Sequence, residues 1–356
     1  MGSFHPEDYR VLPDQEILVR IKRRKSEMGR SLLILGHHYQ RQEIIDVSDR
    51  IGDSFQLSEE ASKATRAKYI VFCGVRFMAE TADILCRPGQ KVIHPDPRAG
   101  CPLADMANLD DVEQAWEELG GVVNLSTLIP VTYVNSGADL KAFCGRHGGI
   151  VCTSSNASKA LDWAFERGRI AFFFPDQHLG RNTGRAMGYS HEEMPLWDPH
   201  EELGGNLPET LEDARLILWN GYCHVHTFFT ASMVKRMRER HPGCLVVVHP
   251  ECEEKVVLAA DAAGSTSFIV RYVEETPPKS TIVIGTESNL VARLKRMYEN
   301  KTILALAQSL CPNMWRIDPA RLCWCLENPD EAPIVSVPDG IKKDARIALD
   351  RMLSLA

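Results

Sequence analysis

Three successive groups of short apolar runs are the feature of this sequence that most limits its fold. The runs are rich in Val, Ile and Leu and alternate with amphipathic stretches, which is typical of buried parallel strands with helices on both faces of the sheet. The chain is therefore expected to be α/β. The predicted strands lie in 31–39, 69–75 and 91–97, in 128–137, 149–156 and 169–177, and in 244–252, 266–273, 280–288 and 301–307.

Each group of predicted strands leads to one cysteine in a turn. Cys101 lies in AGCPLAD, Cys223 in NGYCHVH and Cys311 in LCPNMW. This repetition indicates three related domains around a shared centre. At 356 residues the chain also exceeds the size at which a single hydrophobic core usually stops growing. The predicted domains are 1–103 together with 315–356, then 104–225, and then 226–314.

Composition favours a small-molecule partner over a nucleic acid or a membrane. A net charge of −7, with 25% charged and 44% apolar residues, gives no electrostatic reason to bind nucleic acid or anionic lipid. We find no secretory segment at the start and no run of about 18 apolar residues, so a cytoplasmic location is expected. Thiols stay reduced there, which suits the 11 cysteines to packing and metal binding rather than disulfides.

Several nucleotide and metal motifs are absent from the sequence. It has no G-x-G-x-x-G, Walker A, H-E-x-x-H or C-x-x-C pattern. The sequence therefore gives no positive indication of a nucleotide-binding fold, a zincin or a zinc ribbon. Cys323 and Cys325 are interpreted as two ordinary thiols on a buried segment, because a one-residue spacer is poor for joint chelation.

The three turn cysteines are the candidate metal ligands. Five others lie in or beside apolar runs, where a free cysteine behaves as a small hydrophobe: Cys73, Cys86, Cys144, Cys152 and Cys244. Three thiolates from three domains can hold a [4Fe-4S] cluster and leave one iron without a protein ligand, where substrate binds. Two alternatives use the same thiolates: a mononuclear iron or zinc hydrolase with one open position, and a non-catalytic iron-sulfur sensor.

Polar residues follow the first predicted strand of each group, where open parallel sheets bind their ligands. These pairs are His37 and Tyr39, Tyr133 and Asn135, and His249 and Glu251. Hydroxyl residues also stand at predicted helix starts, which suit a phosphate or dicarboxylate, with helix capping as the alternative. They are Ser54, Ser154, Ser265 and Thr266. For His178 and Arg181, catalysis, a loop salt bridge and a domain contact all stay open.

Two segments outside the predicted strands also have expected structures. The polar, turn-rich stretch 188–211 is too long for a usual connection and is expected to be a surface excursion, with a cover over the active site as one role. After Cys325, residues 330–340 are expected to form a loop. An amphipathic helix over 341–353 is expected to pack back on a domain.

From about residue 28 to residue 317 the chain resembles the quinolinate synthase family. The motifs that carry the resemblance are GHHYQ, GDSFQLS, GVRFMAETADIL, AGCPLADM, TYVNSGADLKA, CTSSNA, FPDQHLGRNTGR, CHVH, HPEC, GSTS, IGTES and CPNM. The resemblance implies three homologous αβα domains in a pseudo-threefold arrangement around a central active site. It also implies that iminoaspartate and dihydroxyacetone phosphate are condensed to quinolinate, with loss of phosphate and water, in de novo NAD biosynthesis.

The same resemblance assigns residues to this chemistry. Cys101, Cys223 and Cys311 take the positions of the ligands of a [4Fe-4S] cluster that acts as a Lewis acid. The implied substrate-binding residues are His37, Ser54, Tyr133, Asn135, Ser154, His249, Glu251, Ser265 and Thr266, with Ser155 as an alternative to Ser154. Tyr39, Glu251, His37 and Thr266 are expected to be catalytic.

Two further expectations come from the family. An aspartate oxidase or aspartate dehydrogenase is expected to be functionally linked, as the source of iminoaspartate. Some relatives carry a C-x-x-C-x-x-C run that ends at the third ligand, and the sequence SLCPNM lacks it. Redox regulation through that run is therefore not expected here.

Overall fold

The computed structural model describes residues 6–355 and divides into two compact units. Unit 1 contains the described residues up to 101 together with 310–337, and unit 2 contains 102–309 and the residues from 338 onward. Each unit thus combines segments that lie far apart in the sequence. Unit 1 is built on one sheet and unit 2 on two. The boundaries of the three expected domains stay a prediction.

Unit 1 is built on a five-stranded sheet. Its strands are β1 (Leu32–His37), β2 (Arg50–Gly52), β3 (Tyr69–Cys73), β4 (Lys91–Ile93) and β14 (Ile334–Val335). Their order is β14-β4-β3-β1-β2, and only β14 runs antiparallel to its neighbour. Apolar strand residues such as Ile34, Val71 and Ile93 are buried in the core of this unit, as is common for β-branched side chains in a sheet.

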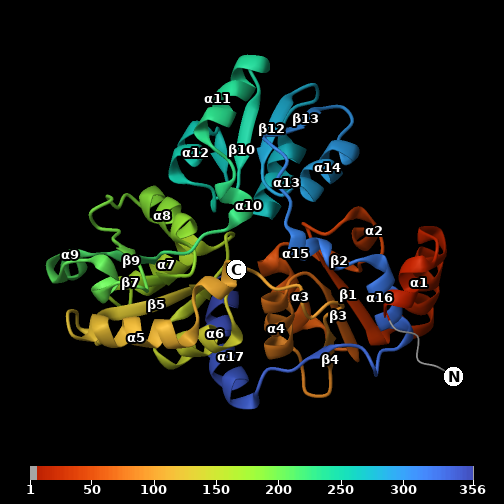
Figure 1. Cartoon of the computed structure of the whole chain (residues 1–356), viewed down its shortest axis with the longest axis horizontal. Helices are drawn as coiled ribbons and strands as arrows, with labels where there is room; N and C mark the ends of the chain where they lie inside the picture. Colours follow the sequence, from red (N-terminus) through yellow and green to blue (C-terminus); the bar gives the residue numbers. More distant parts are fainter. Residues whose placement is uncertain (1–5, 356) are drawn as a thin grey trace. The chain divides into compact units, whose positions relative to one another are not determined.

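The helices of unit 1 come from both ends of the chain. They are α1 (Asp14–Met28), α2 (Gln42–Ile45), α3 (Ser54–Lys63), α4 (Arg76–Leu85), α15 (Pro312–Trp315) and α16 (Pro319–Glu327), with 3-10 turns η1 (Pro6–Val11) and η2 (Gly29–Ser31). Figure 1 shows α16 beside α1. The Tyr9 hydroxyl donates to the Glu327 carboxylate at 2.6 Å, and Arg24 Nε donates to the Leu326 carbonyl at 3.1 Å. These bonds fix the late segment to η1 and to α1.

The first sheet of unit 2 also has five strands, all parallel to their neighbours. They are β5 (Leu128–Tyr133), β6 (Ile150–Cys152), β7 (Ile170–Phe174), β8 (Leu196–Trp197) and β9 (Leu216–Trp219), in the order β6-β5-β7-β9-β8. Its helices are α5 (Leu109–Gly120), α6 (Ala138–Arg146), α7 (Ala157–Phe165), α8 (Gln177–Ala186), α9 (Pro208–Asp213) and α17 (Asp339–Leu353), with 3-10 turns η3 (Ala104–Met106), η4 (Leu125–Thr127) and η5 (Glu202–Gly205). The strands are buried apart from Leu196, which explains their near-continuous apolar sequences.

The second sheet of unit 2 has four parallel strands. They are β10 (Leu245–Val248), β11 (Ala262–Ala263), β12 (Thr281–Gly285) and β13 (Thr302–Ala305), in the order β11-β10-β12-β13. The helices around it are α10 (His224–Thr227), α11 (Ala231–Arg240), α12 (Glu254–Ala259), α13 (Thr266–Glu275) and α14 (Ser288–Met297). Val246, Val248 and Val283 lie in its core with no exposed surface.

The three sheets share one strand order. If the main strands of each sheet are counted along the chain, the second lies beside the first, the third on its other side, and the fourth next to the third. This holds for β1 to β4, for β5, β6, β7 and β9, and for β10 to β13. The α/β class and the three short, mainly parallel sheets expected from the sequence are therefore confirmed.

One predicted strand is wrong. Residues 266–273 belong to α13, not to a strand. The Ser265 hydroxyl accepts a hydrogen bond from the Phe268 N–H and starts the helix, and Thr266, Ile269 and Val273 are buried on one side of it. That spacing of three and four residues is helical, whereas the β-branched composition had favoured a strand.

The two segments outside the main strands are more ordered than expected. Within 188–211, β8 pairs with β9, and Met194 and Trp197 are buried, so this stretch extends a sheet edge and is only partly a surface excursion. The expected loop 330–340 contains β14, which pairs with β4. The C-terminal helix is confirmed as α17, which lies along α6 in Figure 1.

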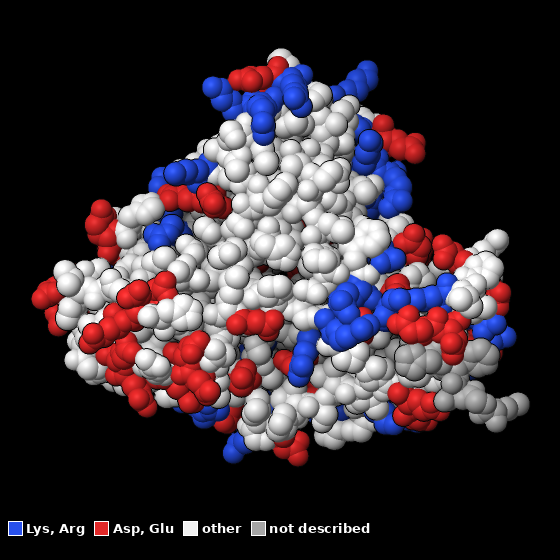
Figure 2. Space-filling model, in the orientation of Figure 1, with Lys and Arg blue, Asp and Glu red and all other residues white. Residues whose placement is uncertain are grey.

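Two further features concern the apolarity of the helices and the charge of the surface. Among residues 6–355, no helix combines the length and apolarity needed to cross a membrane. On the face shown in Figure 2, acidic side chains gather over α5 and basic ones over the end of α11. Acidic and basic side chains thus gather in separate places on this face of unit 2.

Candidate active site

The same place in each sheet carries a polar pair. His37 ends β1, Tyr133 ends β5, and His249 directly follows β10, so all three residues lie where the first strand of their sheet ends. Two residues further on stand Tyr39, Asn135 and Glu251. All six predicted residues therefore lie at the carboxyl ends of parallel strands, the edge at which such sheets bind ligands.

The predicted hydroxyl residues share a second position. Ser54, Ser154 and Ser265 each lie two residues after the second strand of their sheet, which ends at Gly52, Cys152 and Ala263 respectively. Only Ser265 caps its helix with its own hydroxyl, since α3 is capped by Asp53 and α7 begins at Ala157. Helix capping alone therefore does not explain why a serine stands at all three positions.

The candidate metal ligands occupy a third shared position. Cys101, Cys223 and Cys311 follow β4, β9 and β13, the fourth strand of each sheet. All three are partly exposed, whereas seven other cysteines are buried. Burial raises the pKa of buried thiols such as Cys73 and Cys323 to about 12, which disfavours the thiolate that binds metals.

The fourth partly exposed cysteine has a different role. Cys86 follows α4, and its Sγ donates to the Asp83 carbonyl at 3.2 Å. The three cysteines predicted as ligands are thus the remaining thiols with solvent access among residues 6–355. Their chemistry fits a thiolate-bound iron-sulfur cluster. Cys101 and Cys311 belong to unit 1 and Cys223 to unit 2.

In unit 1, the strand-end pair is held by its own backbone. The Tyr39 N–H donates to His37 Nδ1 at 3.1 Å, and the two rings meet edge to face with centroids 4.9 Å apart. Both side chains are buried. Because Nδ1 acts as an acceptor, the proton of a neutral His37 ring must sit on Nε2, which makes that atom a donor for an anionic ligand.

In unit 2, the equivalent pair has the same backbone bond and more partners. The Glu251 N–H donates to His249 Nδ1 at 3.3 Å. The Glu251 carboxylate lies 2.6 Å from His226 Nδ1, and the His226 and His249 rings stack with centroids 4.3 Å apart. The Tyr133 hydroxyl also hydrogen-bonds to Glu251. Glu251 is thus surrounded by groups that can exchange protons.

Two buried carboxyl groups in unit 2 have opposite protonation preferences. Burial alone would raise the pKa of Glu251, but His249, His226 and the hydrogen bonds from His226 and Tyr133 outweigh it and lower that pKa. Burial and the negative charge of Glu251 raise the pKa of Asp176 well above its usual range. Such separated pairs are how sites assign one ionised base and one neutral acid.

Other predicted residues complete this side of unit 2. The Tyr133 hydroxyl also hydrogen-bonds to Ser154. Thr266, the first residue of α13, is buried beside the capping Ser265. The buried Asn135 Oδ1 has no hydrogen-bond partner among residues 6–355. A buried acceptor of this kind indicates a donor supplied by a ligand or water.

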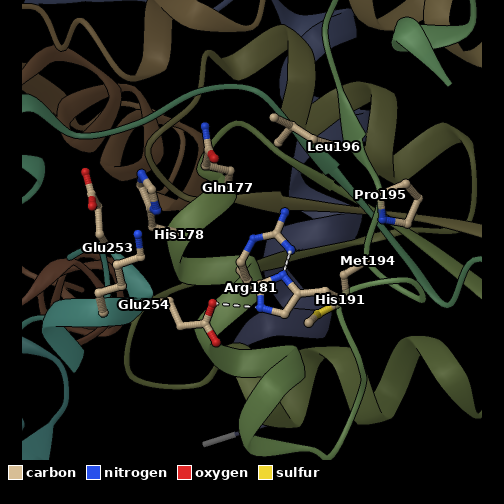
Figure 3. A pocket seen from close by; sticks show the side chains of 10 residues that line it. Gln177, His178, Arg181, His191, Met194, Pro195, Leu196, Glu253 and Glu254 are labelled. Carbon is tan, nitrogen blue, oxygen red and sulfur yellow. Dashed lines mark hydrogen bonds and ion pairs between the residues drawn. The ribbon is translucent and has the colours of Figure 1, made fainter. Parts of the chain in front are cut away.

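His178 and Arg181 line a separate pocket. It is an open surface hollow of about 460 Å³ over the start of α8 (Figure 3). Arg181 Nη1 lies 3.3 Å from His191 Nδ1, and His191 Nε2 lies 2.9 Å from the Glu254 carboxylate. The guanidinium thus connects α8 to the 188–211 segment. None of the residues in the predicted substrate set lines this pocket.

Three residues around Glu251 were not predicted from the sequence to belong to the site. They are His226, Asp176 and Thr286, whose hydroxyl lies 3.2 Å from His226 Nε2. The signal for His226 was the spacing of Cys223 and His226, since residues three apart share a helix face. Asp176 follows β7 and Thr286 follows β12, so the signal for both was their position at the end of a predicted strand.

Comparisons with known proteins agree with this arrangement. A family model for the quinolinate synthetase A protein matches residues 19–354. The quinolinate synthase of Corynebacterium glutamicum is 50% identical over 355 residues, which is 98% of this chain and 90% of that protein. The quinolinate synthase of Rhodopirellula baltica is 48% identical, and the match covers 100% of this chain and 95% of that protein. The quinolinate synthase of Geobacillus kaustophilus is 49% identical, and the match covers 99% of this chain and 96% of that protein.

Proposed function

Because the chain belongs to the quinolinate synthetase A family, we propose that it makes quinolinate for de novo NAD biosynthesis. In the proposed reaction, iminoaspartate and dihydroxyacetone phosphate condense into the pyridine ring, with release of phosphate and two molecules of water. Carbon, nitrogen and phosphorus balance, and no external oxidant or reductant is needed. The observation that carries the proposal is the threefold repetition of ligand-suited residues at matching strand ends.

Cys101, Cys223 and Cys311 are proposed to hold a [4Fe-4S] cluster. Each of them follows the fourth strand of its sheet, and each has solvent access. When bound through three thiolates, the cluster would supply one iron without a protein ligand as a Lewis acid for a substrate oxygen or nitrogen. The cytoplasm is the proposed compartment, because reduced thiols are maintained there.

Anion binding is proposed for the histidines and hydroxyls at the strand ends. His37 and His249 both accept a backbone hydrogen bond at Nδ1, so each can present an Nε2–H to a carboxylate or phosphate. Ser54, Ser154 and Ser265 occupy matching positions beside them, and Thr266 adds a further hydroxyl. Both substrates carry such anionic groups, to which these ring and hydroxyl groups can donate hydrogen bonds.

Proton transfer is proposed for Glu251 and Tyr39. Glu251 is ionised, so it can accept a proton from a substrate carbon, and it contacts His226 and Tyr133, to which that proton can be passed on. Tyr39 stands at the matching place in unit 1 and is buried. Its phenol hydroxyl is a hydrogen-bond donor, so it can give a proton to a leaving group.

The decisive experiment is anaerobic reconstitution with iron and sulfide, followed by metal analysis and an assay with both substrates. We expect about four irons and four sulfides per chain and formation of quinolinate. In a chain first freed of zinc, one iron without sulfide would favour the mononuclear hydrolase, and a cluster without quinolinate would favour the sensor. Cys223→Ala should abolish the visible absorption and the activity, whereas the control Cys86→Ala should retain both.

The supply of iminoaspartate is the remaining part of the proposal. An aspartate oxidase or an aspartate dehydrogenase would produce it, so one of these enzymes is the proposed functional partner. A coupled assay with each supplier should give quinolinate from aspartate and dihydroxyacetone phosphate.

A further inference from the structure

Cys223, His226 and Glu251 place three different ligand atoms close together in unit 2. A sulfur, a ring nitrogen and a carboxylate oxygen lie within 4.8 Å of one another. Cys223 directly precedes α10 and His226 lies in it, three residues later, so both project from the first turn. Glu251 comes from the turn after β10. The three groups therefore converge from two separate elements.

The surroundings of these three residues match those of a metal site. His226 and Glu251 are buried, at 1% and 2% exposure, whereas Cys223 is partly exposed and leaves an approach from solvent. If His226 binds through Nδ1, its Nε2–H can donate to the Thr286 hydroxyl 3.2 Å away. Tyr133 hydrogen-bonds to the Glu251 carboxylate. Metal-binding histidines and carboxylates commonly have such outer partners, which fix their orientation.

We propose that Cys223, His226 and Glu251 bind a single zinc ion when the chain carries no iron-sulfur cluster. Zinc accepts thiolate, imidazole and carboxylate ligands together, and three protein ligands leave a fourth position for water. The thiolate and the carboxylate together balance the 2+ charge of the ion. On binding, the thiol proton leaves to solvent and the sulfur–zinc bond replaces it.

This site competes with the cluster for one atom. The competition, though not the zinc site itself, rests on the proposed function, in which Cys223 is also a cluster ligand. A zinc ion on Cys223 would leave the cluster with only Cys101 and Cys311. Zinc and cluster occupancy are then mutually exclusive in one chain.

The zinc site can be tested with the full-length chain purified without a cluster. Cobalt(II) is the optical probe, because a thiolate bound to cobalt gives a near-ultraviolet charge-transfer band. The intact chain should show the band intensity of a single thiolate and bind one zinc in competition with a chromophoric chelator. A band intensity that corresponds to two or three thiolates, or the absence of metal binding, would overturn the proposal without any variant.

Variants then assign the ligands. Loss of an outer partner costs roughly 10- to 100-fold in metal affinity, so Thr286→Val should weaken zinc binding by an amount in that range. Cys223→Ala and His226→Ala remove a ligand itself and should weaken zinc binding by more. Cys101→Ala and Cys311→Ala are the matched controls and should bind zinc as the intact chain does. Wild-type affinity in His226→Ala, or loss of zinc in Cys101→Ala, would refute the assignment.

The competition is tested separately from the proposed function. Zinc-loaded and zinc-free chains are given iron and sulfide, and visible absorption and bound zinc are measured. We expect cluster formation to fail until zinc is removed. Cluster formation with zinc retained would refute the competition, whereas a zinc-free chain that forms no cluster would refute the proposed function and leave the zinc site intact.

Discussion

Two buried carboxylates, Asp96 in unit 1 and Glu251 in unit 2, show how similar positions acquire different roles. Both follow a strand, and they are 3% and 2% exposed. For each, burial alone would raise the pKa, and nearby cations and hydrogen bonds lower it instead. The cations differ in kind, and that difference decides what each carboxylate can do.

Asp96 is paired with arginines. Arg98 Nε lies 3.1 Å from it, and Arg316 and Arg321 each approach to 3.3 Å. An arginine stays protonated at any physiological pH, so this group cannot exchange a proton and acts as a fixed ionic connection between segments of unit 1. Glu251 is paired with histidines and a tyrosine, which can both give and accept protons. We therefore expect Asp96 to matter for stability and Glu251 for turnover.

The largest expected effect is that of Glu251→Gln. Removing the carboxylate should lower kcat by about 10²- to 10⁴-fold, because glutamine cannot take a proton from a substrate carbon. The visible spectrum of the cluster should persist, since Glu251 is not proposed as a ligand to it. Glu253→Gln is the control, an exposed glutamate two residues away, and should stay close to the wild-type rate. An unchanged kcat in Glu251→Gln would remove this residue from proton transfer.

The two strand-end histidines should separate binding from turnover. His37→Gln and His249→Gln each remove a proposed hydrogen bond to an anionic substrate group, which corresponds to about a 10- to 100-fold loss in kcat/KM. We expect His37→Gln to act mainly on KM. His249→Gln should also lower kcat, because His249 is one of the groups that keep Glu251 ionised. The exposed His200→Gln is the control, and equal effects on kcat in both variants would contradict the distinction.

Asp96→Asn should reduce stability rather than catalytic chemistry. Losing charged hydrogen bonds should cost about 1.5–3 kcal/mol of unfolding free energy at neutral pH. The folded-state pKa of Asp96 is lowered, so its contribution is present above the unfolded pKa of about 3.9 and lost as the pH falls through the folded value. Denaturant unfolding should therefore show a difference that shrinks below about pH 4. Asp105→Asn, at an exposed position, should change stability by less than about 0.5 kcal/mol.

The sequence predicted the sheets better than it predicted the neighbours of Glu251. Apolar runs mark buried strands directly, and nine of the ten predicted strand segments contain an observed strand. The failure at 266–273 arose because β-branched residues can also cover one side of a helix once Ser265 caps it. His226 lies 25 positions from Glu251 in the chain, and only folding brings it to 2.6 Å. Local patterns cannot report such a contact.

The matching positions in the three sheets favour Ser154 over Ser155 as the residue that contacts substrate, a choice that the sequence motif leaves open. Ser154 lies two residues after its strand, as Ser54 and Ser265 do, and it hydrogen-bonds to Tyr133, whereas Ser155 is exposed. Ser154→Ala should therefore lower kcat/KM by about 3- to 10-fold, the cost of one neutral hydrogen bond, and Ser155→Ala by less than about 2-fold. Steady-state kinetics with dihydroxyacetone phosphate varied would measure both. A larger loss in Ser155→Ala would mean that matching strand ends do not identify the residues that contact substrate.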